Sequence, residues 1–112
     1  MATGDYLGEF EQIVLLAVAR TSDDAYGITI RDEIQRRIGR DVSIDALYLT
    51  LDRLTCKGYL RSRLGEATAV RVGRAKRYFA LTTAGESALQ ASREQQSKMW
   101  AGLDLGHIPK GA

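Results

Sequence analysis

The segment SIDALYLTLDRLTCKGYLRSRL, residues 43–64, changes its hydrophobic period halfway along. In its first part, apolar side chains recur at steps of four and three, which predicts an amphipathic helix over residues 44–57 with Ser43 as a favourable N-cap. The buried stripe of this helix is expected to consist of Leu47, Leu51 and Leu54. After Gly58 the side chains alternate between two sides, with Tyr59, Arg61 and Arg63 on one and Leu60, Ser62 and Leu64 on the other. This period of two predicts a strand. The sequence therefore predicts a helix that turns at a glycine directly into a strand.

A first helix is predicted over residues 7–20. Its apolar stripe follows the i, i+3, i+7 spacing and consists of Leu7, Phe10, Val14, Ala17 and Val18. Ile13, Leu15 and Leu16 fall outside this stripe, so the middle of the helix is apolar on nearly every side. A chain of 112 residues has one core, and a partner chain is therefore expected to cover the remaining apolar side chains.

A second helix is predicted over residues 26–38, where Ile30, Ile34 and Ile38 recur at steps of four. Asp24 is expected to accept backbone hydrogen bonds at its start, and Gly39 is expected to end it in a left-handed conformation. Only a short connection then separates this helix from the one that begins after Ser43.

The chain after the first strand is predicted to return as a hairpin. Residues 65–75 read as a loop and residues 77–81 as a second strand. Thr82 and Thr83 are candidate N-caps for a fourth helix that runs to about residue 103, and Glu86 stands three residues after Thr83, as in a capping box. This helix has few apolar residues, which is typical of a helix that packs on a neighbouring chain.

Basic residues are concentrated between residues 53 and 80. Eight bases and the single acid Glu66 give this segment a charge of +7, whereas the remaining eight bases and 13 acids give −5. The bases are Arg53, Lys57, Arg61, Arg63, Arg71, Arg74, Lys76 and Arg77. A surface of this kind is expected to meet phosphates. The alternative is a basic hairpin that only keeps the protein dissolved.

The predicted fold class is mainly α with a small β-hairpin, as in a winged helix-turn-helix followed by a C-terminal helix. Residues 1–82 are expected to form the DNA-binding domain, residues 83–105 a dimerisation helix and residues 106–112 a flexible tail. In such proteins the second helix of the motif enters the major groove. The expected DNA contacts are Ser43, Asp45, Tyr48, Leu49, Arg53, Arg71, Arg74, Lys76 and Arg77.

Two of these contacts have specific alternatives. Arg53 can reach a guanine edge or a phosphate, or else form a salt bridge with Asp52 or Asp32. Tyr48 can donate its hydroxyl to a phosphate, or else be an ordinary half-buried core tyrosine. Both interpretations of each residue remain open at the level of sequence.

A set of short patterns occurs within residues 7–85. They are Tyr26-Gly27, Leu47-Tyr48, Leu51, Arg53-Leu54, Gly58-Tyr59-Leu60, Gly73-Arg74, Lys76-Arg77-Tyr78, Leu81-Thr82 and Gly85. Together they resemble the PadR family of bacterial transcriptional regulators. Leu49 and Thr83 stand where that family often has proline.

The resemblance implies a homodimeric repressor of the short class, with one C-terminal helix. Twofold symmetry and the spacing of the major groove then predict that its operator in double-stranded DNA is an inverted repeat. The single cysteine and the lack of a secretory signal predict a cytoplasmic protein. It implies a dimer formed by the first and last helices, with Phe10, Ile13, Leu16, Met99 and Leu103 as the expected dimer contacts. Some members of the family bind flat aromatic compounds against a tryptophan of the last helix. Trp100 is the corresponding candidate here, and its alternative role is to pack the dimer interface.

Catalytic and metal sites are not expected. Cys56 is the single cysteine, so an intrachain disulfide and a cysteine-built zinc site lack the residues they need. His107 is the single histidine and lies in the tail expected to be frayed, so a histidine-based catalytic or metal site would depend on a mobile terminus. The longest apolar run has seven residues, where a membrane-spanning helix needs about 20. We expect no enzymatic activity and no cofactor. The alternative function is a winged-helix module whose basic face binds an acidic protein.

Overall fold

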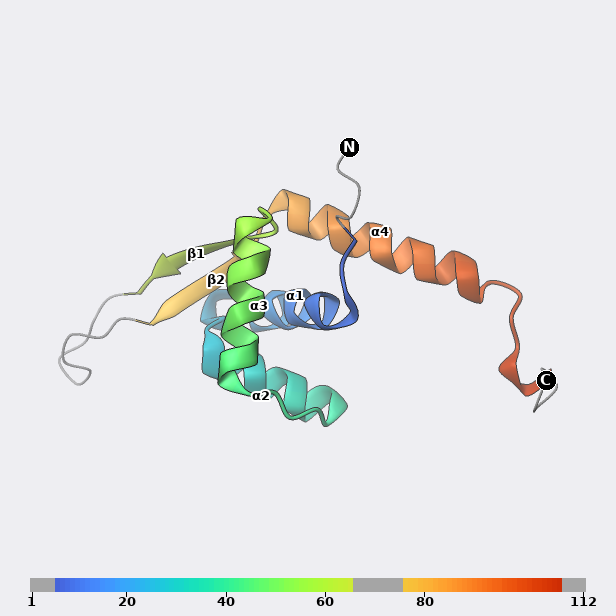
Figure 1. Ribbon diagram of the computed structural model, residues 1–112, viewed down its shortest axis with the longest axis horizontal. Helices are drawn as coiled ribbons and strands as arrows, with labels where there is room; N and C mark the ends of the chain where they lie inside the picture. Colours follow the sequence, from blue (N-terminus) through green and yellow to red (C-terminus); the bar gives the residue numbers. More distant parts are fainter. Residues whose placement is uncertain (1–5, 66–75, 108–112) are drawn as a thin grey trace.

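The computed structural model describes residues 6–65 and 76–107. The elements are α1 (Glu9–Thr21), the 3₁₀ helix η1 (Ser22–Asp24), α2 (Gly27–Ile38), α3 (Ile44–Cys56), β1 (Leu60–Leu64), β2 (Arg77–Leu81), α4 (Thr83–Trp100) and the 3₁₀ helix η3 (Leu105–His107). Figure 1 shows α1, α2 and α3 gathered together, with the hairpin on one side and α4 running away on the other. The prediction of a mainly helical fold with one antiparallel hairpin is confirmed.

Helix α3 begins and ends where its caps predict. The Ala46 N–H donates to the Ser43 hydroxyl oxygen at 3.1 Å, which satisfies one of the free donors of the first turn. The three leucines of the predicted stripe are fully buried, and truncating any one of them to alanine costs about 2–5 kcal/mol of stability. Beyond Lys57, Gly58 adopts φ +84°, a conformation that glycine enters without strain, and the chain turns into β1.

Helix α1 is buried on a wider face than its sequence pattern predicts. Val14, Ala17 and Val18 are buried as expected, but Leu15, predicted to lie off the stripe, is also fully buried. Because α1 contacts α2 as well as α3 and β2, its core-facing side covers more than one stripe. Leu16 does point outward, with 51% of its surface exposed.

Helix α2 does not use Asp24 as its cap. Asp24 belongs to η1, and the helix begins at Gly27 after the N-cap Tyr26. The Thr29 hydroxyl accepts a hydrogen bond from the Tyr26 N–H at 3.0 Å and donates to the Asp24 carbonyl. The prediction was wrong because Asp24 ends the 3₁₀ turn, two residues before the N-cap. Gly39 ends the helix at φ +66°, as predicted.

The hairpin has one face toward the helices and one face outward. β1 and β2 pair antiparallel with Leu60 opposite Leu81 and Ser62 opposite Phe79, and Leu60 and Phe79 are buried. Within the described residues the sheet has two strands, and the Phe79 N–H of β2 donates to the carbonyl of Ala25, just before α2, at 2.9 Å. This bond fixes the hairpin against the start of α2.

Helix α4 is docked only at its beginning. Thr82 is its N-cap and accepts from the Gly85 N–H at 3.0 Å, so the predicted capping box between Thr83 and Glu86 does not form. The helix ends at Trp100, three residues earlier than predicted, and Gly102 follows at φ +76°. Residues 106 and 107, expected to be frayed, lie in η3, and residues 108–112 fall outside the described part of the chain.

In the described ranges, none of the helices combines the length and apolar character needed to cross a membrane.

Candidate nucleic-acid interface

The outward face of α3 carries the side chains that the helical period predicts. Asp45, Leu49 and Arg53 are exposed, with Leu49 exposed over 63% of its surface. Ser43 is also exposed, although its hydroxyl oxygen caps the helix. This face is small and mixed in charge, and it offers few groups that can read base edges.

Tyr48 lies at the shoulder of α3 with its ring and its hydroxyl in different surroundings. The ring packs at the edge of the core, with its centroid 6.5 Å from that of Phe79. The hydroxyl lies beside the first residue of α2, because a β-carbon at Gly27 would come within 2.5 Å of the Tyr48 Oη. In the described residues, Tyr48 makes no hydrogen bond and its hydroxyl is not sealed from solvent. The ring therefore has a structural role and the hydroxyl remains available to a ligand.

Four side chains form an alternating stack where the wing meets the start of α2. The Lys76 ammonium lies 4.1 Å from the centroid of the Tyr26 ring, Tyr26 meets Tyr78 edge-on at 5.6 Å, and Arg63 lies 4.7 Å over Tyr78. We call Lys76, Tyr26, Tyr78 and Arg63 the wing-base stack. It holds the Lys76 ammonium over the ring of Tyr26, the N-cap of α2, whose helix dipole favours an anion, and it holds Arg63 at the other end of the stack.

Arg77 is held along α3 by an ion pair. Its Nη1 lies 2.7 Å from the Asp52 Oδ1, and its guanidinium lies 4.8 Å over the Phe79 ring. Both partners are partly exposed, so the pair contributes at most about 1 kcal/mol to stability. Asp52 is thus engaged by Arg77, and Asp32 lies 3.8 Å from Arg31.

Arg53 is therefore not engaged in either of its alternative salt bridges. Within residues 6–65 and 76–107 it makes no ion pair, and its side chain is exposed. Its charge helps to lower the pKa of Glu11 on α1, but in the described chain no hydrogen bond or ion pair holds its guanidinium there. Arg71 and Arg74, two further expected contacts, lie outside the described residues.

Lys57 turns away from the wing toward α1. Its ammonium lies 3.0 Å from the Glu11 Oε2, and the other carboxylate oxygen of Glu11 accepts from the Gly8 N–H at 2.9 Å. Burial raises the pKa of Glu11, but the Gly8 and Lys57 hydrogen bonds and the charges of Lys57 and Arg53 outweigh it, so this pKa lies below its usual 4.5. Sequence reasoning missed this contact because its partners are 46 residues apart.

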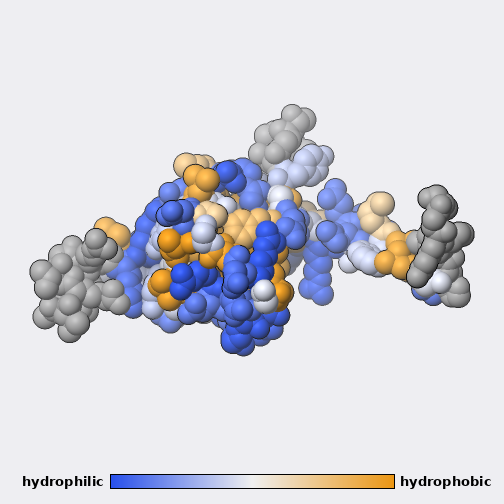
Figure 2. All heavy atoms as spheres, turned by 60° about the horizontal axis from the view of Figure 1, so that its bottom comes forward, coloured by the Kyte–Doolittle hydropathy of each residue, from blue (hydrophilic) through white to orange (hydrophobic). Residues whose placement is uncertain are grey.

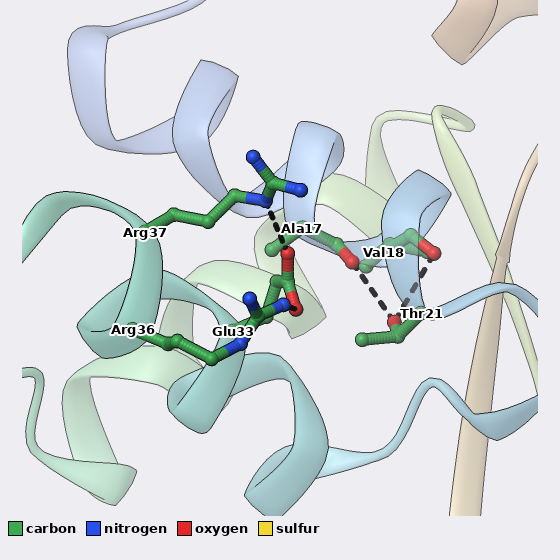
Figure 3. A network of polar contacts seen from close by, with 6 residues as sticks. All are labelled: Ala17, Val18, Thr21, Glu33, Arg36 and Arg37. Atoms are coloured by element: carbon green, nitrogen blue, oxygen red, sulfur yellow. Dashed lines mark hydrogen bonds and ion pairs between the residues drawn. The ribbon is translucent and has the colours of Figure 1, made fainter.

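The basic residues at the end of α2 are paired within that helix. Figure 3 shows Arg36 and Arg37 converging on Glu33. The Arg36 Nη2 and the Arg37 Nε each lie 2.6 Å from an oxygen of the Glu33 carboxylate. The Thr21 hydroxyl, drawn in the same view, donates to carbonyls of the last turn of α1. The hydrogen bond from Arg37, and then that from Arg36, lowers the pKa of Glu33. These arginines stabilise the helix end, and they add little to the candidate interface.

The expected dimer contacts differ in exposure. Phe10 and Ile13 are half-buried, whereas Leu16, Met99 and Leu103 are exposed over 51%, 77% and 47% of their surfaces. Trp100 is 54% exposed and lines an open groove between α1 and α4 together with Leu16. Figure 2 shows apolar residues at the far end of α4, away from the helical body. Phe10 and Ile13 pack against the core, and the Arg40 guanidinium lies 5.0 Å over the Phe10 ring, so the uncovered side chains among the five are those of Leu16, Met99 and Leu103.

Metal-binding and catalytic groupings are not found in the described part of the chain. It contains no cluster of three or more His, Cys, Asp or Glu side chains that could hold a metal ion. Cys56 is an exposed free thiol on α3, and His107 is exposed in η3.

A comparison with protein-family models matches residues 15–91 to the "Transcriptional regulator PadR-like family". Among solved structures, the chain resembles a PadR family transcription regulator from Clostridium difficile at 21% identity and a TM-score of 0.64, covering 80% of this chain and 88% of that one. It resembles F93 from STIV, a winged-helix DNA-binding protein, at 22% identity and a TM-score of 0.66, covering 89% and 100%.

The complex structure of hsRosR-S1 matches at 25% identity and a TM-score of 0.67, covering 87% of this chain and 79% of that one. No curated protein matches the chain in sequence. The family match covers more than half of the chain and includes α2, α3, both strands and the start of α4. The chain therefore belongs to the PadR-like family of transcriptional regulators, a family of winged-helix DNA-binding proteins.

Proposed function

We propose that the protein is a homodimeric transcriptional repressor that binds an inverted-repeat operator in double-stranded DNA. The observation that carries this proposal is the arrangement at the start of α2. There the Tyr48 hydroxyl of α3 lies against Gly27, the first residue of α2, and the Lys76 ammonium lies over the ring of Tyr26, the N-cap of the same helix. A phosphate at this point meets a hydroxyl donor, a cation and a favourable helix dipole together.

The proposed phosphate contacts position the protein on the duplex. Tyr48 donates its hydroxyl, and Lys76 supplies a charge that the wing-base stack holds in place. Arg77, held along α3 by Asp52, is proposed to contact a further phosphate with its remaining donors. Arg71 and Arg74 belong to the same proposed surface by sequence. These contacts give affinity that falls steeply with salt concentration.

The proposed base contacts come from the outward face of α3. Arg53 has the fork of donors that pairs with a guanine edge, and Asp45 can accept from a cytosine amino group. Leu49 is apolar and exposed, and it suits a thymine methyl group. Ser43 adds a hydroxyl at the end of the helix. Because only one of these side chains makes a strong bidentate contact, discrimination between sequences is expected to be modest.

Two copies are proposed because one copy leaves apolar side chains uncovered at α1 and along the far half of α4. Leu16, Met99 and Leu103 are the main ones, and Phe10 and Ile13 border them on α1. A twofold pair presents two α3 helices, and this symmetry calls for an inverted repeat. Trp100 is proposed to pack in this interface. Its place in the α1–α4 groove also suits a flat aromatic ligand that would release the operator.

Selection of bound duplexes from a random DNA pool tests the proposal. The wild-type protein is expected to enrich an inverted repeat. Arg53→Ala is expected to relax the choice at one base pair of each half-site and to weaken binding about tenfold. Arg36→Ala removes the same charge from the end of α2 and serves as the matched control. Enrichment of no sequence, with binding to acidic proteins instead, would support the protein-interaction module.

A further inference from the structure

The junction between α3 and β1, residues 57–59, connects the proposed recognition helix to the wing. Three backbone N–H groups of the junction return to carbonyls in the last turns of α3, each at 3.0 Å. They join Lys57 to Arg53, Gly58 to Thr55, and Tyr59 to Leu54. The direction in which the wing leaves α3 is therefore fixed by hydrogen bonds.

Helix α4 begins on the same junction. The Thr82 hydroxyl donates to the Gly58 carbonyl at 2.6 Å, and the Thr82 N–H donates to the Tyr59 carbonyl at 3.1 Å. A β-carbon at Gly85 would lie 2.2 Å from the backbone carbonyl oxygen of Tyr59, so the first turn of α4 packs directly against the backbone of the junction. Any displacement of the junction moves α3, the wing and α4 together.

Glu11 joins this junction to α1. Its carboxylate is bound on both oxygens, by the Gly8 N–H at 2.9 Å and by the Lys57 ammonium at 3.0 Å, and only 8% of the residue is exposed. It is one of two buried polar or charged residues in the described chain, the other being Thr50. Glu9, two residues earlier, contacts Arg40 and has 75% of its side chain exposed.

We propose that Glu11 is a positioning residue for DNA binding. By holding Lys57, it sets the orientation of α3 and the wing relative to α1, the helix that carries three of the five proposed dimer contacts. This inference rests on the proposed DNA-binding function. The two recognition helices of a twofold dimer enter successive major grooves only when the distance between them is well defined. Contacting groups must be held within about 0.5 Å of the productive geometry.

One substitution distinguishes this role from a simple electrostatic effect, because the two predict opposite changes in DNA affinity. Glu11→Gln removes a negative charge next to Lys57 and Arg53, so a purely electrostatic effect would strengthen DNA binding. The substitution keeps the shape and one acceptor for Gly8, but it loses the ion pair that fixes Lys57. The positioning role predicts the opposite: the variant is more positive and yet binds DNA more weakly. The expected increase in Kd is about tenfold, which corresponds to the loss of one charge-assisted hydrogen bond.

The experiment measures the Kd for a selected operator as a function of salt, at a temperature where far-UV circular dichroism shows every variant to be folded. Glu11→Gln is compared with Glu9→Gln, which makes the same change of charge in the same turn of α1. Glu11→Gln is expected to bind about tenfold more weakly with an unchanged salt slope. Glu9→Gln is expected to bind as the wild type does, or slightly more tightly.

Lys57→Gln provides a test that does not depend on the folding of the Glu11 variant. Lys57 is the partner of Glu11, so this substitution is expected to weaken DNA binding without changing the slope of log Kd against log salt. Removing a lysine that neutralises a phosphate would instead lower that slope by about 0.9. Lys57→Arg, which can still reach Glu11, is expected to restore the wild-type Kd. The double variant is expected to bind no more weakly than either single variant, because the two residues act as one unit.

The outcomes distinguish this inference from the proposed function. Equal or tighter binding by Glu11→Gln, or a salt slope lowered by Lys57→Gln, overturns the positioning role while DNA binding stands. A wild-type protein that binds no duplex overturns the proposed function, and the positioning role with it.

Discussion

Gly27 and Tyr48 lie in direct contact, because a β-carbon at position 27 would come within 2.5 Å of the Tyr48 hydroxyl oxygen and within 2.9 Å of two ring atoms. The first residue of α2 is thus a glycine because the Tyr48 side chain of α3 occupies the space that a larger residue would need. This contact joins the two helices of the motif at the point where we propose that a phosphate binds.

Gly27→Ala is expected to displace the Tyr48 ring and to weaken DNA binding about tenfold or more. Alanine is the better helix former, so the helical content should not fall. Gly8→Ala is the control, because the nearest heavy atom to its added β-carbon lies at 3.7 Å, an ordinary contact. Titration of a labelled operator measures both variants. Unchanged binding by Gly27→Ala would show that the position of Tyr48 does not matter to DNA.

Tyr48→Phe keeps the ring against Phe79 and removes only the hydroxyl. We expect it to cost about 1 kcal/mol of DNA affinity, since one hydrogen bond to a phosphate can no longer form. Thermal unfolding should change little, because the hydroxyl makes no hydrogen bond within the described chain. A lower unfolding temperature with unchanged DNA affinity would instead support the interpretation of Tyr48 as an ordinary core residue.

Lys76→Ala is expected to weaken binding to all DNA sequences by a similar factor. If Lys76 binds one phosphate per protomer, the slope of log Kd against log salt should fall by about 0.9 for each phosphate that the variant no longer neutralises. Lys98→Ala, which removes an exposed lysine from the last turn of α4, should leave the slope as it is. An equal effect of both substitutions would mean that Lys76 acts only through the net charge.

The pKa of Glu11 predicts a dependence of stability on pH. Because this pKa lies below 4.5 in the folded protein, the unfolded chain binds the proton more readily, and the stabilisation is present at neutral pH and lost as the pH falls through the folded pKa. We expect Glu11→Gln to be less stable than the wild type by about 1–3 kcal/mol at pH 7. The difference should shrink as the pH falls below 4.5. Urea unfolding across this range measures it, and a constant difference would contradict the account.

Local signals were sufficient to predict much of the fold from sequence. The change of period at Gly58 and the cap at Ser43 place α3 and β1 correctly, since each signal acts within a few residues. The burial of Leu15 was missed because it depends on which elements pack around α1. Asp24 failed as a cap because a 3₁₀ turn, which the pattern does not distinguish from a loop, comes first.

The candidate interface was predicted only in part, because local signals show the faces of helices but not the contacts between distant residues. The outward face of α3 follows from helical geometry, so Asp45, Leu49 and Arg53 are exposed as expected. The pairing of Arg77 with Asp52 and of Lys57 with Glu11 joins residues 25 and 46 positions apart, and charge counting cannot reveal it. The pattern Tyr26-Gly27 was noted in the sequence, but its reason, the space that Tyr48 occupies, is visible only in the fold.

The central claim is that two copies bind an inverted repeat through paired α3 helices. The most direct test compares the Kd for the selected operator with that for the same operator carrying about five extra base pairs between its half-sites, which rotates one half-site to the far side of the duplex. The account predicts half-site centres about 10 base pairs apart and loss of specific binding on insertion. A single asymmetric site, or an insertion tolerated without loss, would contradict it.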